Sequence, residues 1–284
     1  MMDAIVLDNV TKKRGDFHVK RLDLRIPQGY ITGLVGPNGS GKTSLVSLMM
    51  GLMFPDHGSV FVLGGDIRLP DTKQRVGFVY DDLYMYEDYT IQKMHKVIAP
   101  HYVHWNDDLF YVYLEKFRLP YRKKLKTFSK GMRMKCGLLF ALSHEPELLI
   151  MDEPTAGLDP VFRRELLGIV QELMVREKQT VLFATHITSD LDKIADYIVF
   201  LDDAEVKMQQ SMEDLRENFH LVRGKKAMLD ADVRRLFLGL EESNVGFTGL
   251  YEGDPSVFTD VDETVVAEPA SLEDLLYYMT RKEG

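Results

Sequence analysis

Short, continuous runs of apolar residues recur along the chain, and segments with helical periodicity separate the later runs. An unbroken apolar run is typical of a strand that is buried on both faces of a parallel sheet. Runs of this kind occupy residues 30–35, 75–79, 148–151, 181–184 and 197–201. Helices are expected between the last three runs, at Arg163–Lys178 and Ser189–Ala195. The alternation of strand and helix predicts an α/β fold with a doubly wound parallel sheet.

Two other regions have different patterns. Residues 22–26 alternate apolar and polar side chains, and 5–7 is a short apolar run; we expect both to be half-exposed strands, and 60–63 is a further strand before a Gly-Gly turn. From about Tyr89 to Leu142 the apolar positions follow a helical period. We therefore expect a mostly helical subdomain over this stretch, inserted before the next buried strand.

The last part of the chain predicts a separate, small α+β domain. A helical spacing links Val233, Leu236, Phe237 and Leu240. Residues 245–247 and 265–266 are short apolar segments that suggest strands. Ser271 and Asp274 form a capping-box pattern before the apolar positions of a last helix. We predict an accessory domain at 219–284, after a first domain at 1–218.

Composition narrows the class of protein. The chain has 284 residues, 45% of them hydrophobic, which is enough for one large domain and an appendage. Its net charge of −9 argues against a surface that binds nucleic acid. A single cysteine, Cys136, excludes a disulfide framework and fits a cytosolic compartment. The N-terminus has no signal-peptide pattern and no window reaches about 20 apolar residues, so we expect a chain that does not cross a membrane by itself.

The segment from Gly36 to Thr43 carries the pattern G-x-x-x-x-G-K-[ST] between a predicted strand and a predicted helix. Glycines let backbone amides close around phosphate oxygens, Lys42 supplies a point charge for the β- and γ-phosphates, and the Thr43 hydroxyl suits Mg²⁺. This context predicts a site for a nucleoside triphosphate. The residues expected around the phosphates are Gly36, Pro37, Asn38, Gly39, Ser40, Gly41, Lys42, Thr43 and Ser44.

A second candidate feature is the acidic pair Asp152-Glu153, at the end of the buried strand 148–151. Beside a phosphate loop, Asp152 is positioned to hold Mg²⁺ directly or through water, and Glu153 to orient or deprotonate an attacking water. Taken alone, an acidic pair at a strand end is more often a solvated turn. The interpretation therefore depends on the motifs around it.

In order and spacing, these motifs resemble those of an ABC-type ATPase. Residues 149–160 look like the Walker B segment and the D-loop of that family, with Asp159 in the D-loop. His186 follows the next strand, where the family keeps its switch histidine. The place of the family's signature sequence is taken by Ser129, Lys130, Gly131 and Met132. The resemblance covers about residues 3 to 215 and implies a P-loop NTPase core of ABC type.

The resemblance implies a function for two copies of the chain. One copy would supply the phosphate loop, Mg²⁺ ligands and Glu153 as general base, while the other would aim Ser129 and Gly131, at the start of a helix, at the γ-phosphate of ATP. His186 would contact the γ-phosphate and stabilise its developing charge. Hydrolysis would remove these shared contacts and release the head-to-tail homodimer.

The sequence departs from the family pattern at three places. Lys130 replaces a residue that is usually small, and its charge is expected near the partner's phosphates. Asp81 stands where the family usually has a glutamine that contacts Mg²⁺ or water, so this contact is an open question. An aromatic residue that stacks on adenine is expected where Arg14 stands; either Arg14 or nearby Phe17 stacks on the base, or the base is held weakly.

Two functional classes fit such an ATPase. One is an ATPase subunit at the cytoplasmic face of the membrane, where it drives a separately encoded transmembrane permease. The other is a soluble ABC-type ATPase of translation or DNA repair; these usually carry two cassettes or long coiled-coil inserts, and this chain has one cassette and an ordinary insert. We favour transport, and the narrower resemblance is to bacterial exporters of antimicrobial or amphipathic peptides such as phenol-soluble modulins. In that case the residues that either pack under a loop or dock the permease are Tyr80, Tyr84, Tyr86 and Tyr89.

Overall fold

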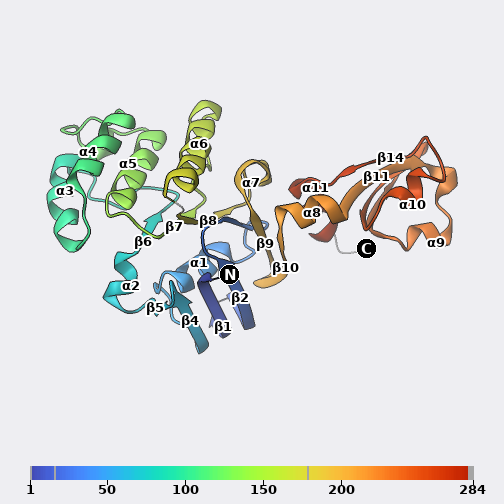
Figure 1. Cartoon of the computed structure of the whole chain (residues 1–284), viewed down its shortest axis with the longest axis horizontal. Coiled ribbons are helices and arrows are strands. Elements are labelled where there is room, and N and C mark those ends of the chain that lie inside the picture. Colours follow the sequence, from blue (N-terminus) through green and yellow to red (C-terminus); the bar gives the residue numbers. More distant parts are fainter. Residues whose placement is uncertain (1, 16, 178, 281–284) are drawn as a thin grey trace. The chain divides into compact units, whose positions relative to one another are not determined.

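The computed structural model describes residues 2–15, 17–177 and 179–280. Contacts divide the chain into two compact units. The first comprises Met1–Ile187 and Val199–Met208, and the second comprises Thr188–Ile198 and Gln209–Gly284. Figure 1 shows the elements of each unit. The domain limits suggested by the sequence, 1–218 and 219–284, remain a prediction.

Two sheets form the centre of the first unit. The four-stranded antiparallel sheet has the order β2-β1-β4-β5. Its strands are β1 (Asp3–Arg14), β2 (Phe17–Pro27), β4 (His57–Val62) and β5 (Gly65–Asp66). The six-stranded sheet has the order β10-β9-β3-β8-β7-β6, in which β3, β8, β7 and β6 are parallel. Its strands are β3 (Ile31–Val35), β6 (Val76–Val79), β7 (Leu148–Asp152), β8 (Thr180–Thr185), β9 (Tyr197–Asp202) and β10 (Glu205–Ser211). The buried runs of the sequence are thus the strands of this sheet, as predicted.

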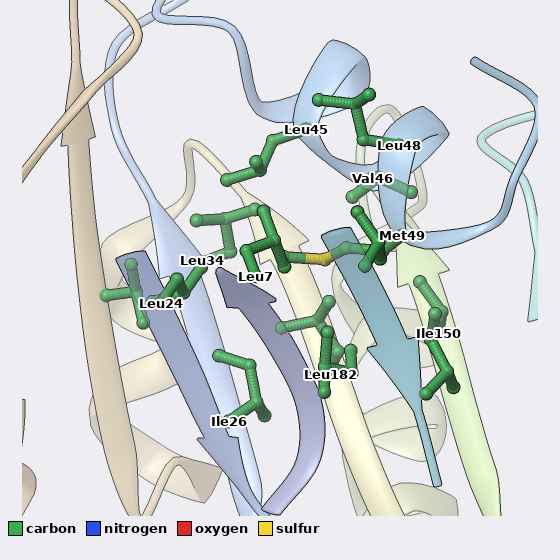
Figure 2. Close-up of a cluster of buried hydrophobic side chains, with 14 of the residues drawn as sticks. Leu7, Leu24, Ile26, Leu34, Leu45, Val46, Leu48, Met49, Ile150 and Leu182 are labelled. Atoms are coloured by element: carbon green, nitrogen blue, oxygen red, sulfur yellow. The ribbon is translucent and has the colours of Figure 1, made fainter. Parts of the chain in front are cut away.

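Helix α1 (Lys42–Met49) packs into the main hydrophobic cluster together with strands of both sheets. Figure 2 shows this cluster, with Leu7, Leu24 and Ile26 from the antiparallel sheet, Leu34, Ile150 and Leu182 from the parallel sheet, and Leu45, Val46, Leu48 and Met49 from α1. Full burial of such a side chain contributes about 1.5–3 kcal/mol relative to exposure. This packing fixes the start of α1 at the end of β3, which is where the phosphate loop lies.

A mostly helical segment lies between β6 and β7, and its helices α3, α4 and α5 lie close together in Figure 1. Side chains of Thr90, Asn106 and Ser129 cap the three helices by accepting hydrogen bonds from backbone amides. The helices of the first unit, besides α1, are α2 (Pro70–Gln74), α3 (Ile91–Ile98), η1 (Ala99–His101), α4 (Asp107–Lys116), η2 (Leu125–Thr127), α5 (Lys130–Leu142) and α6 (Pro160–Glu177). Helix α6 begins earlier than predicted, at a proline, and Lys178 lies outside the described residues. Within the described ranges, none of the helices has the length and apolar character needed to span a membrane.

The second unit contains an antiparallel sheet with the order β12-β13-β11-β14. Its elements are α7 (Thr188–Ile194), α8 (Met212–Asn218), β11 (Phe219–Lys225), η3 (Lys226–Met228), α9 (Ala231–Arg234), β12 (Phe237–Glu242), β13 (Gly246–Glu252), α10 (Ser256–Thr259), β14 (Val266–Pro269) and α11 (Leu272–Thr280). The capping box before α11 is present, because Ser271 Oγ accepts from the Asp274 amide at 3.1 Å and Asp274 Oδ2 accepts from the Ser271 amide at 3.0 Å.

The prediction of a helix through residues 233–240 is wrong. Helix α9 ends at Arg234, and Phe237 begins strand β12. In the strand, the Phe237 ring stacks on Phe258 at 5.2 Å and the backbone pairs with β13. Cross-strand pairing and aromatic packing therefore override the helical spacing, which is a weak local preference.

Candidate nucleotide site

The phosphate loop connects β3 to α1, and its shape depends on glycine. A β-carbon on Gly36 would lie 2.0 Å from the carbonyl oxygen of Leu201 in β9 and 2.8 Å from Ser40 Oγ. No side chain fits at such distances, so the loop can run against β9 only with glycine at this position. The Ala204 amide also donates to the Ser40 carbonyl oxygen at 2.9 Å, which holds the loop from the turn after β9.

Lys42 is folded over the phosphate loop. Its Nζ donates to the carbonyl oxygens of Gly36 at 2.8 Å and Pro37 at 3.1 Å, and lies 3.8 Å from Glu153 Oε1. The residue is only 6% exposed, and this burial lowers the pKa of its ammonium group, while Glu153 and Asp152 oppose the shift. A charged ammonium group is thus held at the loop by neutral carbonyls and nearby carboxylates.

Asp152 and Thr43 meet at the carboxyl end of β7. Burial raises the pKa of Asp152, whereas a hydrogen bond with the Thr43 side chain lowers it; Glu153 and Asp81 raise it further. Asp152 Oδ1 is buried and has no hydrogen-bond partner in the described part of the chain. A hydroxyl and a carboxylate with a spare oxygen are ligands that Mg²⁺ prefers. Mg²⁺ in nucleotide sites is usually held by one or two protein ligands together with phosphate oxygens and water. The described residues contain no cluster of three or more His, Cys, Asp or Glu side chains that could hold a metal.

Glu153 and His186 form a hydrogen-bonded pair beside the loop. Glu153 Oε2 lies 2.8 Å from His186 Nδ1 and accepts from Thr185 Oγ1 at 3.2 Å. Because a carboxylate can only accept, the pair places the proton of neutral His186 on Nδ1 and leaves Nε2 for another partner. The Glu153 backbone has a φ of 49°, and its amide donates to the Ala184 carbonyl oxygen at 2.8 Å. This unusual backbone conformation is held by β8 and aims the carboxylate at the loop.

An open hollow of ≈ 530 Å³ lies at the phosphate loop. Its lining includes Lys42, Thr43, Asp81, Glu153 and His186, all of which the sequence analysis selected. The lining also includes Asp203 and Ala204, in the β9–β10 turn, which sequence reasoning missed. Their only local signal is a polar turn between two strands, and tertiary contacts bring that turn to the phosphate loop.

Other predicted site residues lie elsewhere. Arg14 is exposed at the end of β1, and the side chain of Phe17 lies outside what the structure describes. The exposed Ser129 caps α5 by accepting from the Met132 amide at 3.3 Å. Asp159 Oδ1 accepts from the amides of Val161 at 3.1 Å and Phe162 at 3.0 Å and so caps α6. Of the four signature residues, Lys130 alone is in the lining of the hollow described above.

Comparisons with known proteins agree with this arrangement. The family model described as "ABC transporter" matches residues 19–156. The chain is 32% identical over 219 residues to the uncharacterized ABC transporter ATP-binding protein YdbJ of Bacillus subtilis (strain 168), covering 73% of this chain and 69% of the relative. It is 30% identical over 224 residues to the bacitracin transport ATP-binding protein BcrA of Enterococcus faecalis, and the match covers 75% of this chain and 71% of the relative. A dimeric post-hydrolysis structure of an ATP-binding cassette with ADP and Pi has a TM-score of 0.65 at 22% identity, and the match covers 73% of this chain and 98% of that structure's chain. That last similarity shows the fold.

Proposed function

The chain belongs to the family of ABC transporter ATP-binding proteins and is an ATPase, and on this premise we propose how its site works and what it drives. Two copies bind ATP between them in a head-to-tail dimer. Hydrolysis drives a separately encoded transmembrane permease at the cytoplasmic face of the membrane. The transported class is amphipathic or antimicrobial peptides, and the similarity to a bacitracin transport ATP-binding protein supports this choice.

The observation that carries the proposal is the position of Glu153. Its carboxylate lies 2.8 Å from His186 Nδ1 and 3.8 Å from Lys42 Nζ, beside the phosphate loop. In this position Glu153 accepts a proton from the attacking water, and His186 Nε2 faces the transferred phosphoryl group. Lys42 and the loop amides hold the β- and γ-phosphates. Thr43 and Asp152 are the residues that would hold Mg²⁺, which neutralises phosphate charge when bound.

What one copy lacks supports the proposed head-to-tail dimer. Ser129 and Gly131 are not in the lining of the hollow that contains Lys42 and Glu153. Ser129 is exposed at the N-terminus of α5, a helix of 13 residues, and its hydroxyl accepts from the Met132 amide, which leaves the Lys130 and Gly131 amides of the first turn for an anion on another molecule. A twofold dimer brings this helix start to the partner's ATP twice.

A surface for the permease lies directly after Asp81. Tyr84 and Tyr86 are 73% and 67% exposed, and a small hollow of ≈ 140 Å³ lies between this segment and α5. Tyrosine gives large contact area at low entropic cost, which suits an interface. Two results would support the permease and its peptide substrates: co-purification of the chain with a membrane subunit, and stimulation of hydrolysis by amphipathic peptides in the reconstituted complex. A chain that acts in translation or DNA repair would show neither result.

The central test is Glu153→Gln. The amide keeps the shape of the side chain but cannot accept the proton, so phosphate release should fall by about 100-fold or more. ATP binding should persist, and an ATP-bound dimer should accumulate in size-exclusion chromatography with light scattering. The control is Glu115→Gln, an exposed acid on α4, which should behave as wild type. Near-normal turnover would exclude Glu153 as the base, and a variant that stays monomeric with ATP would exclude the composite dimer.

A further inference from the structure

Lys130 differs from nearby lysines that face helix α6. Lys135 pairs with Glu165 at 2.9 Å and Lys116 pairs with Glu172 at 2.5 Å. Within the described residues, no acidic side chain forms an ion pair with Lys130, and the residue is exposed. Its Nζ instead lies 3.0 Å from the position that a β-carbon would take on Gly157 of the same chain. The ammonium group is therefore placed against a backbone turn rather than against a carboxylate.

That turn follows Glu153 directly and is fixed at both ends. The Ala156 amide donates to the Glu153 carbonyl oxygen at 3.2 Å, and the Leu158 amide donates to the Thr155 carbonyl oxygen at 3.2 Å. Beyond the turn, Asp159 caps α6. Gly157, with a φ of +67°, lies between these fixed points. The Lys130 ammonium group lies at this position, inside the turn that the hydrogen bond from the Leu158 amide to the Thr155 carbonyl oxygen closes.

A second contact joins the same two segments. A β-carbon on Gly131 would lie 3.0 Å from Cδ1 of Phe162, in the first turn of α6. The first two residues of α5 thus lie beside the segment that leaves Glu153, Lys130 at Gly157 and Gly131 at Phe162. The start of α5 and this segment are therefore neighbours at two points, and a side chain larger than glycine at either point would meet the other segment.

We propose that Lys130 is a positioning residue for hydrolysis in its own subunit. It couples the start of α5 to the turn at Gly157 and thereby sets the position of Glu153. In the dimer proposed above, on which this inference rests, ATP held by one copy contacts Ser129 and Gly131 of the other. Lys130 then transmits the presence of that ATP to the Glu153 of its own chain. In this proposal Lys130 acts within its own chain, whereas the sequence predicts its charge near the partner's phosphates, and the first test below distinguishes the two roles.

The first test separates catalytic rate from nucleotide binding. Lys130→Met removes the charge and keeps most of the stem, so the maximal rate of phosphate release should fall by about tenfold. The ATP concentration for half-maximal rate should stay within about twofold, and Lys130→Arg should restore most of the rate. Lys123→Met, at an exposed lysine before α5, is the matched control and should match wild type. A large rise in the half-maximal ATP concentration at an unchanged rate would overturn the proposal in favour of a phosphate ligand. An unchanged rate and concentration would overturn it in favour of a solvated lysine.

The second test is a double-mutant cycle of hydrolysis rates across the contact. Gly157→Ala places a methyl group 3.0 Å from the ammonium position and should lower the rate; Lys130→Gly removes the obstacle. The rate of the double variant should exceed the product of the two separate effects by about fivefold or more, since the strain of alanine at this φ cancels in the cycle. If the two substitutions change the rate independently of each other, the proposed contact between Lys130 and Gly157 is overturned. Failure of the dimer itself is distinguishable, because Glu153→Gln would then remain monomeric with ATP even when Lys130 is unaltered.

Discussion

Both units of the chain bury polar side chains, but only the first gathers them around a phosphate loop and a hollow. At the end of the parallel sheet of the first unit, Lys42 and Asp152 are 6% and 7% exposed, so opposite charges are removed from water. Such burial costs free energy that packing alone does not return. In the second unit, the cluster around Phe247 is apolar, but the unit also buries the polar residues Asp190, at 0% exposure, and His220, at 9%. Burial of an ionisable side chain therefore indicates a ligand site only where it coincides with a hollow and a phosphate loop, as it does at Lys42.

Among the substitutions that test this comparison, Gly36→Ala in the first unit should have the largest effect, which is a loss of ATP binding. The new β-carbon would lie 2.0 Å from the Leu201 carbonyl oxygen, so the phosphate loop or β9 must shift. A shift of about 1 Å misaligns the loop amides and should weaken ATP binding by about 100-fold or more. Titration calorimetry with ATP measures the loss.

Gly168→Ala is the matched control for that substitution. Gly168 lies within α6, and no atom lies within 4 Å of its added β-carbon. Alanine is favoured over glycine inside a helix by about 1 kcal/mol, so this variant should bind ATP normally and be slightly more stable. If Gly36→Ala also binds ATP normally, the close approach to Leu201 does not shape the site.

In the second unit the corresponding change is Phe247→Ala. Phe247 is 5% exposed and lies 5.5 Å from the Phe237 ring, so its truncation should cost about 3–5 kcal/mol of that unit's stability. ATP affinity should stay within about twofold, because no predicted site residue lies in this cluster. Denaturation followed by hydrogen exchange locates the loss, and Val245→Ala, at a residue that is 85% exposed, is the control. Weakened ATP binding would show that the second unit contributes to the site.

The sequence predicted the first unit better than the second for a physical reason. Strands such as β7 are buried on both faces, so their apolar runs are unbroken and can be recognised locally. The phosphate loop has a similarly local signal, because its glycines and lysine are contiguous. Strand β12 has no such signal: its apolar positions also fit a helix, and only pairing with β13 decides the conformation.

Contacts between distant segments explain what could not be predicted at the site. Asp203 reaches the hollow because β9 runs against the phosphate loop, and its own neighbours in sequence give no indication of this. The position of the Lys130 ammonium group likewise depends on how the start of α5 lies beside the turn at Gly157. The roles of Glu153 and His186 stay predictions, although the structure places them in contact.

The comparison of buried polar groups extends to a histidine in the helical segment of the first unit. His144 is 2% exposed, its ring stacks on Tyr102 at 4.1 Å, and its nitrogens lie 3.4 Å from the Phe140 and 3.3 Å from the Val76 carbonyl oxygens. A neutral imidazole can donate to only one of these two acceptors. Burial lowers the pKa of His144 from its ordinary value of 6.5, so the folded chain keeps this ring neutral.

The smallest of these effects is therefore a loss of stability in mild acid. Below pH 6.5 the His144 ring becomes protonated in the unfolded chain, whereas its lowered pKa keeps it neutral in the folded chain. Its contribution to stability is complete above that pH and decreases as the pH falls toward the folded-state pKa, by at most about 1.4 kcal/mol per pH unit. His144→Gln can still donate to a carbonyl oxygen but does not titrate in this range. Urea denaturation at pH 7.5 and 5.5 should show that the stability gap between wild type and variant shrinks in acid, because the other titrating groups cancel in this difference. A gap that stays constant would mean that His144 is protonated as easily in the folded chain as in the unfolded one.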